Sequence, residues 1–232
     1  MSILDELQIE ITRIREATGP SVVGIANPRG AGSGIIIAKD TVLTNAHNVW
    51  GDEVEVTFAD GRTETGTVSG ADVDGDIAVV HVPTEDAQAL AWDGGTVAIG
   101  SPVFALSNPG GRGLRVTFGF VSGTERSFRG PRGRRIAGSL EHTAPLLPGS
   151  SGGPVVDTSG TLVGINTNRL GEGFYLAIPT ANGLRARVDK LAKGESTDRP
   201  RLGVAIAPSH VARRLRRAVG LPEVDGVLVR GV

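Results

Sequence analysis

The sequence of 232 residues predicts an all-β protein that begins with one helix and closes its main domain with another. About a dozen short runs rich in β-branched residues are separated by Gly, Asp, Asn and Pro, a spacing typical of a β-sandwich or of β-barrels. The chain holds 34 glycines and 13 prolines, which suits many tight turns. The number of runs exceeds what one small barrel needs.

Residues 3–17 predict an amphipathic helix, because apolar side chains recur every three or four residues on one stripe. The stripe consists of Leu4, Leu7, Ile11 and Ile14. Ser2 and Asp5 resemble a capping box at its start, and Gly19-Pro20 ends it. We expect this N-terminal segment, residues 1–18, to pack on the body of the protein or on a neighbouring subunit.

The β-rich runs extend over residues 19–195, which we predict to form one domain with two halves joined near Trp92-Asp93-Gly94-Gly95. Residues 180–193 predict its closing helix. The apolar stripe of that helix is Leu184, Val188 and Leu191.

Residues 194–200 are polar and end in Pro, which predicts a linker. Residues 200–232 then predict a strand, a helix capped by Ser209 and ended by Gly220, and a second strand. One face of the helix carries Val211, Leu215, Ala218 and Val219. So short a segment cannot bury a core of its own, so we interpret it as the first part of a second domain.

Composition narrows the possible function classes. A net charge of −1 gives no general attraction to nucleic acid or to membranes, and the absence of cysteine removes disulfides, thiolate metal sites and Cys nucleophiles. No cofactor is expected, and His81, His142 and His210 are too dispersed in the sequence for a metal site. The charged residues in 3–17 do not fit a signal peptide, and no apolar run is long enough to cross a membrane. These features favour a cytoplasmic location, or an extracytoplasmic one if a targeting segment has been trimmed.

Three separate segments together carry a chemical pattern. They are Thr44-Asn45-Ala46-His47, Asp76-Ile77-Ala78-Val79 and Gly149-Ser150-Ser151-Gly152-Gly153-Pro154. A neutral serine hydroxyl needs an adjacent base to become a nucleophile, and His47 can take the proton of Ser151. Asp76 can hold the imidazole in the required tautomer. The glycines allow the N–H groups of Gly149 and Ser151 to point into one oxyanion hole.

These segments resemble those of trypsin-like serine peptidases, and most closely the HtrA/Deg branch. The resemblance rests on GSGIIIAKDTVLTNAHNV, GADVDGDIAVVHV, SGGPVVDTSGTLVGINT and GFYLAIP. It implies two perpendicular six-stranded antiparallel β-barrels with the triad in the cleft between them. The segment 200–232 resembles the opening of the PDZ domain that follows the protease in this family. The family further implies a homotrimer or larger assembly, protein quality control, unfolded polypeptides as substrates, and peptide C-termini as PDZ ligands.

The sequence departs from the family near the nucleophile. Ser150 stands where the family commonly has Asn, and residues 142–148 lack its usual Asp-Ala pair and Asn. No acidic residue lies in 145–148, so a preference for Lys or Arg at P1, the substrate residue before the cleaved bond, is not expected. Instead we predict an apolar S1 pocket that takes small or medium aliphatic P1 residues. The residues predicted to line it are Leu146, Leu147, Ile165, Asn166 and Thr167.

Two other functions remain open on sequence alone: a chaperone-like binding protein on a protease scaffold, and a latent peptidase that needs a PDZ ligand. The arginines in 126–135 predict either a solvated loop or a regulatory loop, and those in 213–217 a solvated helix face. The Gly-rich segments 32–34 and 110–113 lack the residues of a phosphate-binding loop and are interpreted as β-turns.

Overall fold

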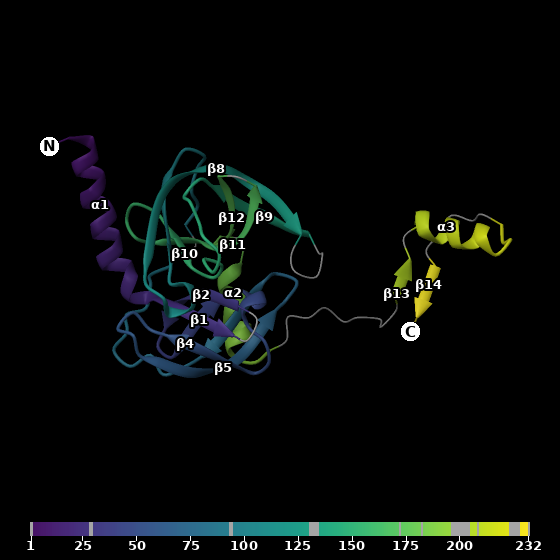
Figure 1. The fold of residues 1–232 in the computed structure, drawn as a ribbon, viewed down its shortest axis with the longest axis horizontal. Coiled ribbons are helices and arrows are strands. Elements are labelled where there is room, and N and C mark those ends of the chain that lie inside the picture. The colour runs from purple at the N-terminus through teal and green to yellow at the C-terminus, as the bar shows by residue number, and fades with distance from the viewer. Residues whose placement is uncertain are drawn as a thin grey trace. The chain divides into compact units, whose positions relative to one another are not determined.

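The computed structural model describes residues 2–27, 30–92, 95–129, 135–171, 173–181, 183–195, 205–207, 209–222 and 228–231. The chain forms two compact units, residues 1–197 and residues 198–232 (Figure 1). The predicted junction residues Asp93 and Gly94, most of the predicted linker 194–200 and the centre of the arginine-rich segment lie outside the described residues.

The first half of unit 1 is a closed six-stranded antiparallel barrel with the strand order β1-β2-β3-β6-β5-β4. Its strands are β1 (Val22–Asn27), β2 (Gly30–Ala38), β3 (Thr41–Thr44), β4 (Glu53–Thr57), β5 (Thr63–Asp72) and β6 (Ile77–His81). Pairing of Ile25 with Val56 joins β1 to β4 and closes the barrel. Alternating apolar residues fill it, as in β4, where Val54 and Val56 are buried while Glu53 and Glu55 are exposed.

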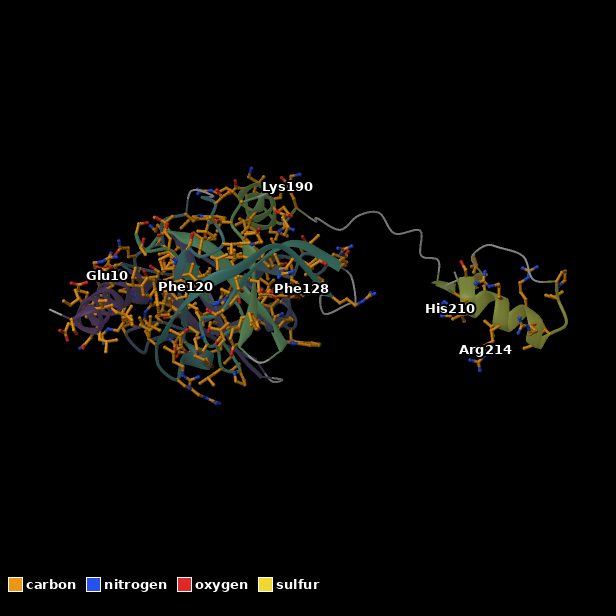
Figure 2. All side chains as sticks on the ribbon, turned by 90° about the horizontal axis from the view of Figure 1, so that it is seen from above. Glu10, Phe120, Phe128, Lys190, His210 and Arg214 are labelled. Carbon is orange, nitrogen blue, oxygen red and sulfur yellow. The ribbon has the colours of Figure 1, made fainter. Side chains whose placement is uncertain are left out.

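The second half repeats this architecture, with the order β10-β11-β12-β9-β8-β7. Its strands are β7 (Pro102–Ser107), β8 (Arg115–Arg129), β9 (Arg135–His142), β10 (Pro154–Val156), β11 (Leu162–Gly171) and β12 (Phe174–Pro179). Pairing of Val155 with Ala105 closes this barrel. Figure 2 draws the side chains of unit 1 as sticks and labels Phe120 and Phe128 of β8, of which Phe128 is buried and Phe120 is exposed. The prediction of two six-stranded antiparallel barrels is therefore confirmed.

The largest hydrophobic core draws on both barrels, which holds the two halves of unit 1 together. Ile35 and Leu43 come from the first barrel, while Phe104, Leu106 and Ile165 come from the second. Burial of such side chains stabilises the fold by roughly 25 cal/mol for each Å² of apolar surface removed from water. The boundary between the barrels is therefore part of the packed interior.

Helix α1 (Ile3–Thr18) lies against the side of unit 1 (Figure 1). Ser2 and Asp5 form the predicted capping box: the Ser2 N–H donates to Asp5 at 2.8 Å, and the Asp5 N–H donates to Ser2 at 3.2 Å. Ile14 is fully buried in the main core, whereas Leu4 is 75% exposed. The C-terminal half of the helix thus packs on the body, as expected, and its first turns do not.

The closing helix α2 (Leu184–Ala192) begins four residues later than predicted, and Leu184, Val188 and Leu191 are its buried side chains. It follows the second barrel in sequence but packs on β5 and β6 of the first. Arg187 of this helix lies 3.4 Å from Asp72 at the end of β5. Helix α2 is therefore a second connection between the two halves.

Unit 2 contains a short antiparallel pair, β13 (Ala205–Ala207) and β14 (Leu228–Gly231), and helix α3 (Ser209–Ala218). The predicted strand–helix–strand order is confirmed. Ala212 is buried, while Leu215 and Val219 of the predicted apolar face are exposed. The PDZ assignment of this segment stays a prediction.

Two further findings concern the sequence predictions. Gly32-Ser33-Gly34 is not a β-turn but lies inside β2, where each glycine allows a neighbour to approach closely; a Cβ at Gly32 would meet the Asn48 side chain at 2.4 Å. Within the described ranges, no helix is both long and apolar enough to cross a bilayer.

Candidate active site between the two barrels

His47 lies in a short 3-10 helix, Ala46–Asn48, directly after β3. Asn45, the residue before this helix, helps to fix it, because its side chain donates a hydrogen bond to the Asp76 carbonyl at 2.9 Å. The His47 side chain is about one-third exposed. The base predicted from the sequence is thus held by the first barrel and reaches the surface.

Asp76 is the residue immediately before β6, and only 1% of its surface is exposed. Its φ of +54° lies in the left-handed region, which few residues other than Gly, Asn and Asp adopt readily. Three donors surround its carboxylate. The His47 N–H and Nδ1 lie 3.2 Å and 2.9 Å from Oδ1, and the Thr167 hydroxyl lies 2.5 Å from Oδ2.

The Asp76 carboxylate determines the tautomer of His47. A carboxylate accepts hydrogen bonds only, so the ring nitrogen facing it, Nδ1, must carry the hydrogen. In the neutral ring, Nε2 is then left with a free electron pair that can accept a proton. The geometry thus holds the His47 ring in place against the buried side chain of Asp76.

Ser151 lies in a tight turn that leads into β10. The Ser150 N–H donates to the Leu147 carbonyl and the Gly153 N–H to the Ser150 carbonyl, both at 3.1 Å. Gly149 has φ +87°, and a Cβ there would lie 2.7 Å from Pro109, so this position requires glycine. Neither the Gly149 N–H nor the Ser151 N–H donates to a carbonyl in the described part of the chain. Both remain available to an oxyanion.

Residues of the first barrel hold the Ser151 turn by donating hydrogen bonds to its backbone carbonyls. The Ser33 N–H donates to the Ser151 carbonyl at 2.8 Å, and the Ser33 hydroxyl donates to the Gly149 carbonyl at 2.9 Å. Asn48, next to His47, also donates to the Ser151 carbonyl, at 2.9 Å. Close approach is possible because Gly152 has no side chain; a Cβ there would lie 2.0 Å from the Ser33 carbonyl.

Thr167 of β11 links the Ser151 turn to Asp76. Its hydroxyl donates to Asp76, and its carbonyl accepts the Ser151 hydroxyl at 3.0 Å. A serine hydroxyl has a single hydrogen, so in this conformation that hydrogen points to Thr167 and not to His47. The three predicted triad residues are therefore gathered in one site, with Ser151 in a resting orientation.

A pocket of 280 Å³ opens beside Ser151. Its lining residues are Leu146, Leu147, Pro148, Gly149, Ser150, Ser151, Asn166, Thr167 and Tyr175. None of them is charged, and Leu147 is 58% exposed. Four of the five residues predicted for the S1 wall are among them. Ile165 is not: it is fully buried in the core shared by the barrels, so its assignment to the pocket is corrected.

Sequence reasoning missed four contributors to this site. Ser33 and Asn48 act from the first barrel, Tyr175 lines the pocket, and His142 packs behind it. Ser150 is buried, and its hydroxyl donates to Ser107 at 3.1 Å, so the polar residue before Ser151 has an internal partner. The glycine pair around Ser33 was the available signal for the first of these, since it marks a close approach of two backbones.

Comparison with known proteins agrees with this geometry. A family model described as a trypsin-like peptidase domain matches residues 32–165. Protease Do-like 1, chloroplastic, of Arabidopsis thaliana is 33% identical over 250 residues, covering 96% of this chain and 55% of the relative. A Halomonas elongata protein named "Probable periplasmic serine endoprotease DegP-like" is 34% identical over 209 residues, covering 87% of this chain and 43% of the relative.

The fold is also found among solved structures. The serine endoprotease from Yersinia pestis has a TM-score of 0.68 and 31% identity, covering 79% of this chain and 66% of that one. The chain spans about half the length of the curated relatives that it matches. These relatives are named as chloroplastic and periplasmic, so the predicted cytoplasmic location is not supported. The matched domain, the two barrels and the arrangement of the site together place the chain in the family of trypsin-like serine peptidases, with relatives of the HtrA/DegP type.

Proposed function

We propose that this chain is a serine endopeptidase in which Ser151 is the nucleophile, His47 the general base and acid, and Asp76 the residue that orients His47. The observation that carries the proposal is the set of donors around Asp76, which leaves Nε2 of His47 as the free base of the site. A buried carboxylate with three well-placed donors also stabilises the imidazolium that forms during the reaction.

The reaction begins when the Ser151 hydroxyl turns from the Thr167 carbonyl toward His47. Its oxygen attacks the carbonyl carbon of the scissile peptide bond while Nε2 of His47 takes the proton. The negative charge on the former carbonyl oxygen is bound by the N–H groups of Gly149 and Ser151, each worth about 2.7–4 kcal/mol in such sites.

His47 then returns the proton to the leaving amine, the C–N bond breaks, and an acyl-enzyme remains on Ser151. Water adds to the ester carbon with His47 as base, and the acid product leaves as the proton returns to Ser151. The cycle needs no metal or organic cofactor.

The uncharged pocket beside Ser151 supports an apolar P1 residue of small or medium size. Tyr175 and Leu146 supply apolar surface, while none of the described lining residues is acidic and able to bind Lys or Arg. Unfolded polypeptides are the substrates we propose, because a P1 side chain and its flanking backbone must both be accessible. By analogy with the HtrA/DegP-type relatives, we further propose a role in protein quality control, a homotrimer, and capture of peptide C-termini by a PDZ domain that begins in unit 2.

The resting orientation of Ser151 supports a second candidate, a latent peptidase. Its hydroxyl donates to Thr167 rather than to the base, so a rotation must precede attack. In this reading a PDZ ligand or assembly shifts the population toward the active rotamer. A chaperone-like binding protein without turnover fits the site less well, because binding alone does not require the oriented base.

The test is cleavage of unfolded casein, followed by gel electrophoresis and mass spectrometry. Ser151→Ala is compared with Ser159→Ala, which changes an exposed serine in the turn between β10 and β11. We expect the wild type and Ser159→Ala to cleave after apolar residues and Ser151→Ala to be inactive. Equal cleavage by all three proteins would contradict the proposal.

A serine-directed phosphonate separates the remaining cases. Labelling of Ser151 without casein cleavage supports the latent peptidase. Neither labelling nor cleavage in the wild type contradicts peptidase function for this chain and favours a binding protein.

A further inference from the structure

His142 is the last residue of β9 and is completely buried behind the pocket. Its ring stacks on Tyr175 of β12, with centroids 5.9 Å apart and an interplanar angle of 28°. Its Nε2 lies 3.0 Å from Oδ1 of Asn166 on β11, whereas its Nδ1 has no hydrogen-bond partner among the residues that the structure describes. A buried imidazole with one bound and one free nitrogen requires a physical explanation.

The hydrogen bonds of Asn166 identify which nitrogen of His142 carries the hydrogen. Its side-chain amide donates to the carbonyls of Gly153 and Pro154 at 3.2 Å and 3.3 Å. Its Oδ1 must therefore be the atom that faces His142, and an amide oxygen can only accept. Nε2 of His142 consequently carries the hydrogen, and Nδ1 is a bare acceptor, which is less costly to leave unpaired than an N–H.

Asn166 in turn holds the segment that follows Ser151. Its carbonyl accepts the Gly152 N–H at 2.8 Å, and its own N–H donates to the Gly153 carbonyl at 2.9 Å. The next residue, Thr167, contacts both Ser151 and Asp76. The Asn166 side chain, which His142 binds, therefore belongs to a residue that holds the Ser151 turn in position.

We infer that His142 is a positioning residue: an imidazole that stays neutral from pH 8 to pH 5, in its Nε2–H tautomer, and that fixes Asn166 and Tyr175 and through them the Ser151 turn and the pocket wall. The expected effect of His142 on kcat rests on the proposed peptidase function, whereas the tautomer and charge of His142 do not depend on that function.

The surroundings favour the neutral ring. Burial lowers the pKa of His142 to about 4, although its bond to Asn166 opposes this shift. The described titratable side chains on the neighbouring strands do not pair with a cation here: Glu141 of β9 is bound to Ser122 and Arg126 of β8, and Tyr175 of β12 stacks on the ring. Protonation would place a second N–H at Nδ1, where no described residue supplies an acceptor.

The first experiment measures the tautomer directly in the Ser151→Ala protein, by long-range ¹H–¹⁵N correlation spectra from pH 8 to pH 5. The His142→Gln spectrum assigns the signals of His142. We expect a neutral ring with the hydrogen on Nε2 throughout this range. A hydrogen on Nδ1, or titration near pH 6.5, would overturn the inference whether or not the chain is a peptidase.

The second experiment compares three variants by peptide hydrolysis and by the rate of phosphonate labelling. His142→Phe keeps a ring against Tyr175 but has no donor. His142→Gln places an amide N–H near the position of Nε2, while His142→Asn is too short to do so. We expect kcat and labelling to fall about tenfold in the Phe and Asn variants, with little change in KM, and Gln to recover most of the loss.

Thermal melting at pH 8 separates positioning from packing. Equal kcat in the wild type and His142→Phe would overturn the inference, as would losses in all three variants that follow their melting temperatures. If His142→Phe does not fold, the comparison of His142→Gln with His142→Asn decides between a positioning role and a packing role. Wild-type protein that neither cleaves nor reacts contradicts the proposed function, and the tautomer measurement then still tests the charge state of His142.

Discussion

Thr167 and Asp76 lie 91 residues apart and come from different barrels, yet the Thr167 hydroxyl donates a hydrogen bond to the Asp76 carboxylate. The same threonine accepts the Ser151 hydroxyl with its carbonyl. One residue of the second barrel thus contacts both the acid and the nucleophile of the proposed triad. Its removal is a direct test of how strongly the site depends on this connection.

Thr167→Val removes the hydroxyl donor while keeping the branched shape and the backbone carbonyl. Hydrogen bonds to charged groups contribute about 1.5–3 kcal/mol, so we expect kcat/KM to fall roughly 10- to 100-fold. Thr167→Ser retains the donor and is the matched control. Steady-state hydrolysis of a peptide with an aliphatic P1 residue measures both, and equal rates for Val and Ser would show that the hydroxyl has no role.

Asp76→Asn tests the orientation of His47. Asn adopts the left-handed φ of +54° at this position readily, so the fold should be preserved. The amide can present an N–H to Nδ1 and thereby stabilise the wrong tautomer, for which a loss of about 10⁴-fold in kcat is expected. Retention of more than a tenth of wild-type kcat, in protein with a normal melting curve, would contradict the assigned role.

Gly149→Ala tests the oxyanion hole. The new Cβ would lie 2.7 Å from Pro109 on a backbone with φ +87°, so the turn must shift and move its N–H. We expect kcat to fall about 10²- to 10³-fold. Gly100→Ala is the matched control, because Gly100 has φ +90° and open space around it. That variant should lose about 1–2 kcal/mol of stability and no activity.

The neutral state of His142 predicts a pH dependence of stability. Its pKa is about 4 in the folded chain and near 6.5 in an unfolded one, so between these values the unfolded state binds the extra proton. The contribution is fully present above pH 6.5 and is lost as pH falls toward 4, by about 3 kcal/mol in total. Urea unfolding at several pH values should show this slope in the wild type and a smaller one in His142→Gln. Parallel curves for the two proteins would refute it.

Local sequence patterns were sufficient for the elements and for the candidate triad. The capping box at Ser2, the apolar stripe of α2 and the β-rich runs depend on residues that are close together in the chain. These elements can therefore be predicted without knowledge of the tertiary structure. The segments around His47, Asp76 and Ser151 are likewise short. Those at Asp76 and Ser151 also contain residues that can adopt a positive φ, namely Asp76, Gly149 and Gly152.

Tertiary structure decided which residues connect these segments. Ser33 and Asn48 bind the Ser151 turn across the boundary between barrels, and no local pattern specifies a hydrogen bond between residues more than 100 positions apart. The register of β11 shifts between Asn166 and Asn168, and such irregularities redirect side chains in ways that simple alternation does not predict. Ile165 lies before this shift, and its side chain is in the core rather than the pocket. The charge of His142 depends on burial, which is a property of the packed barrel and not of the residue.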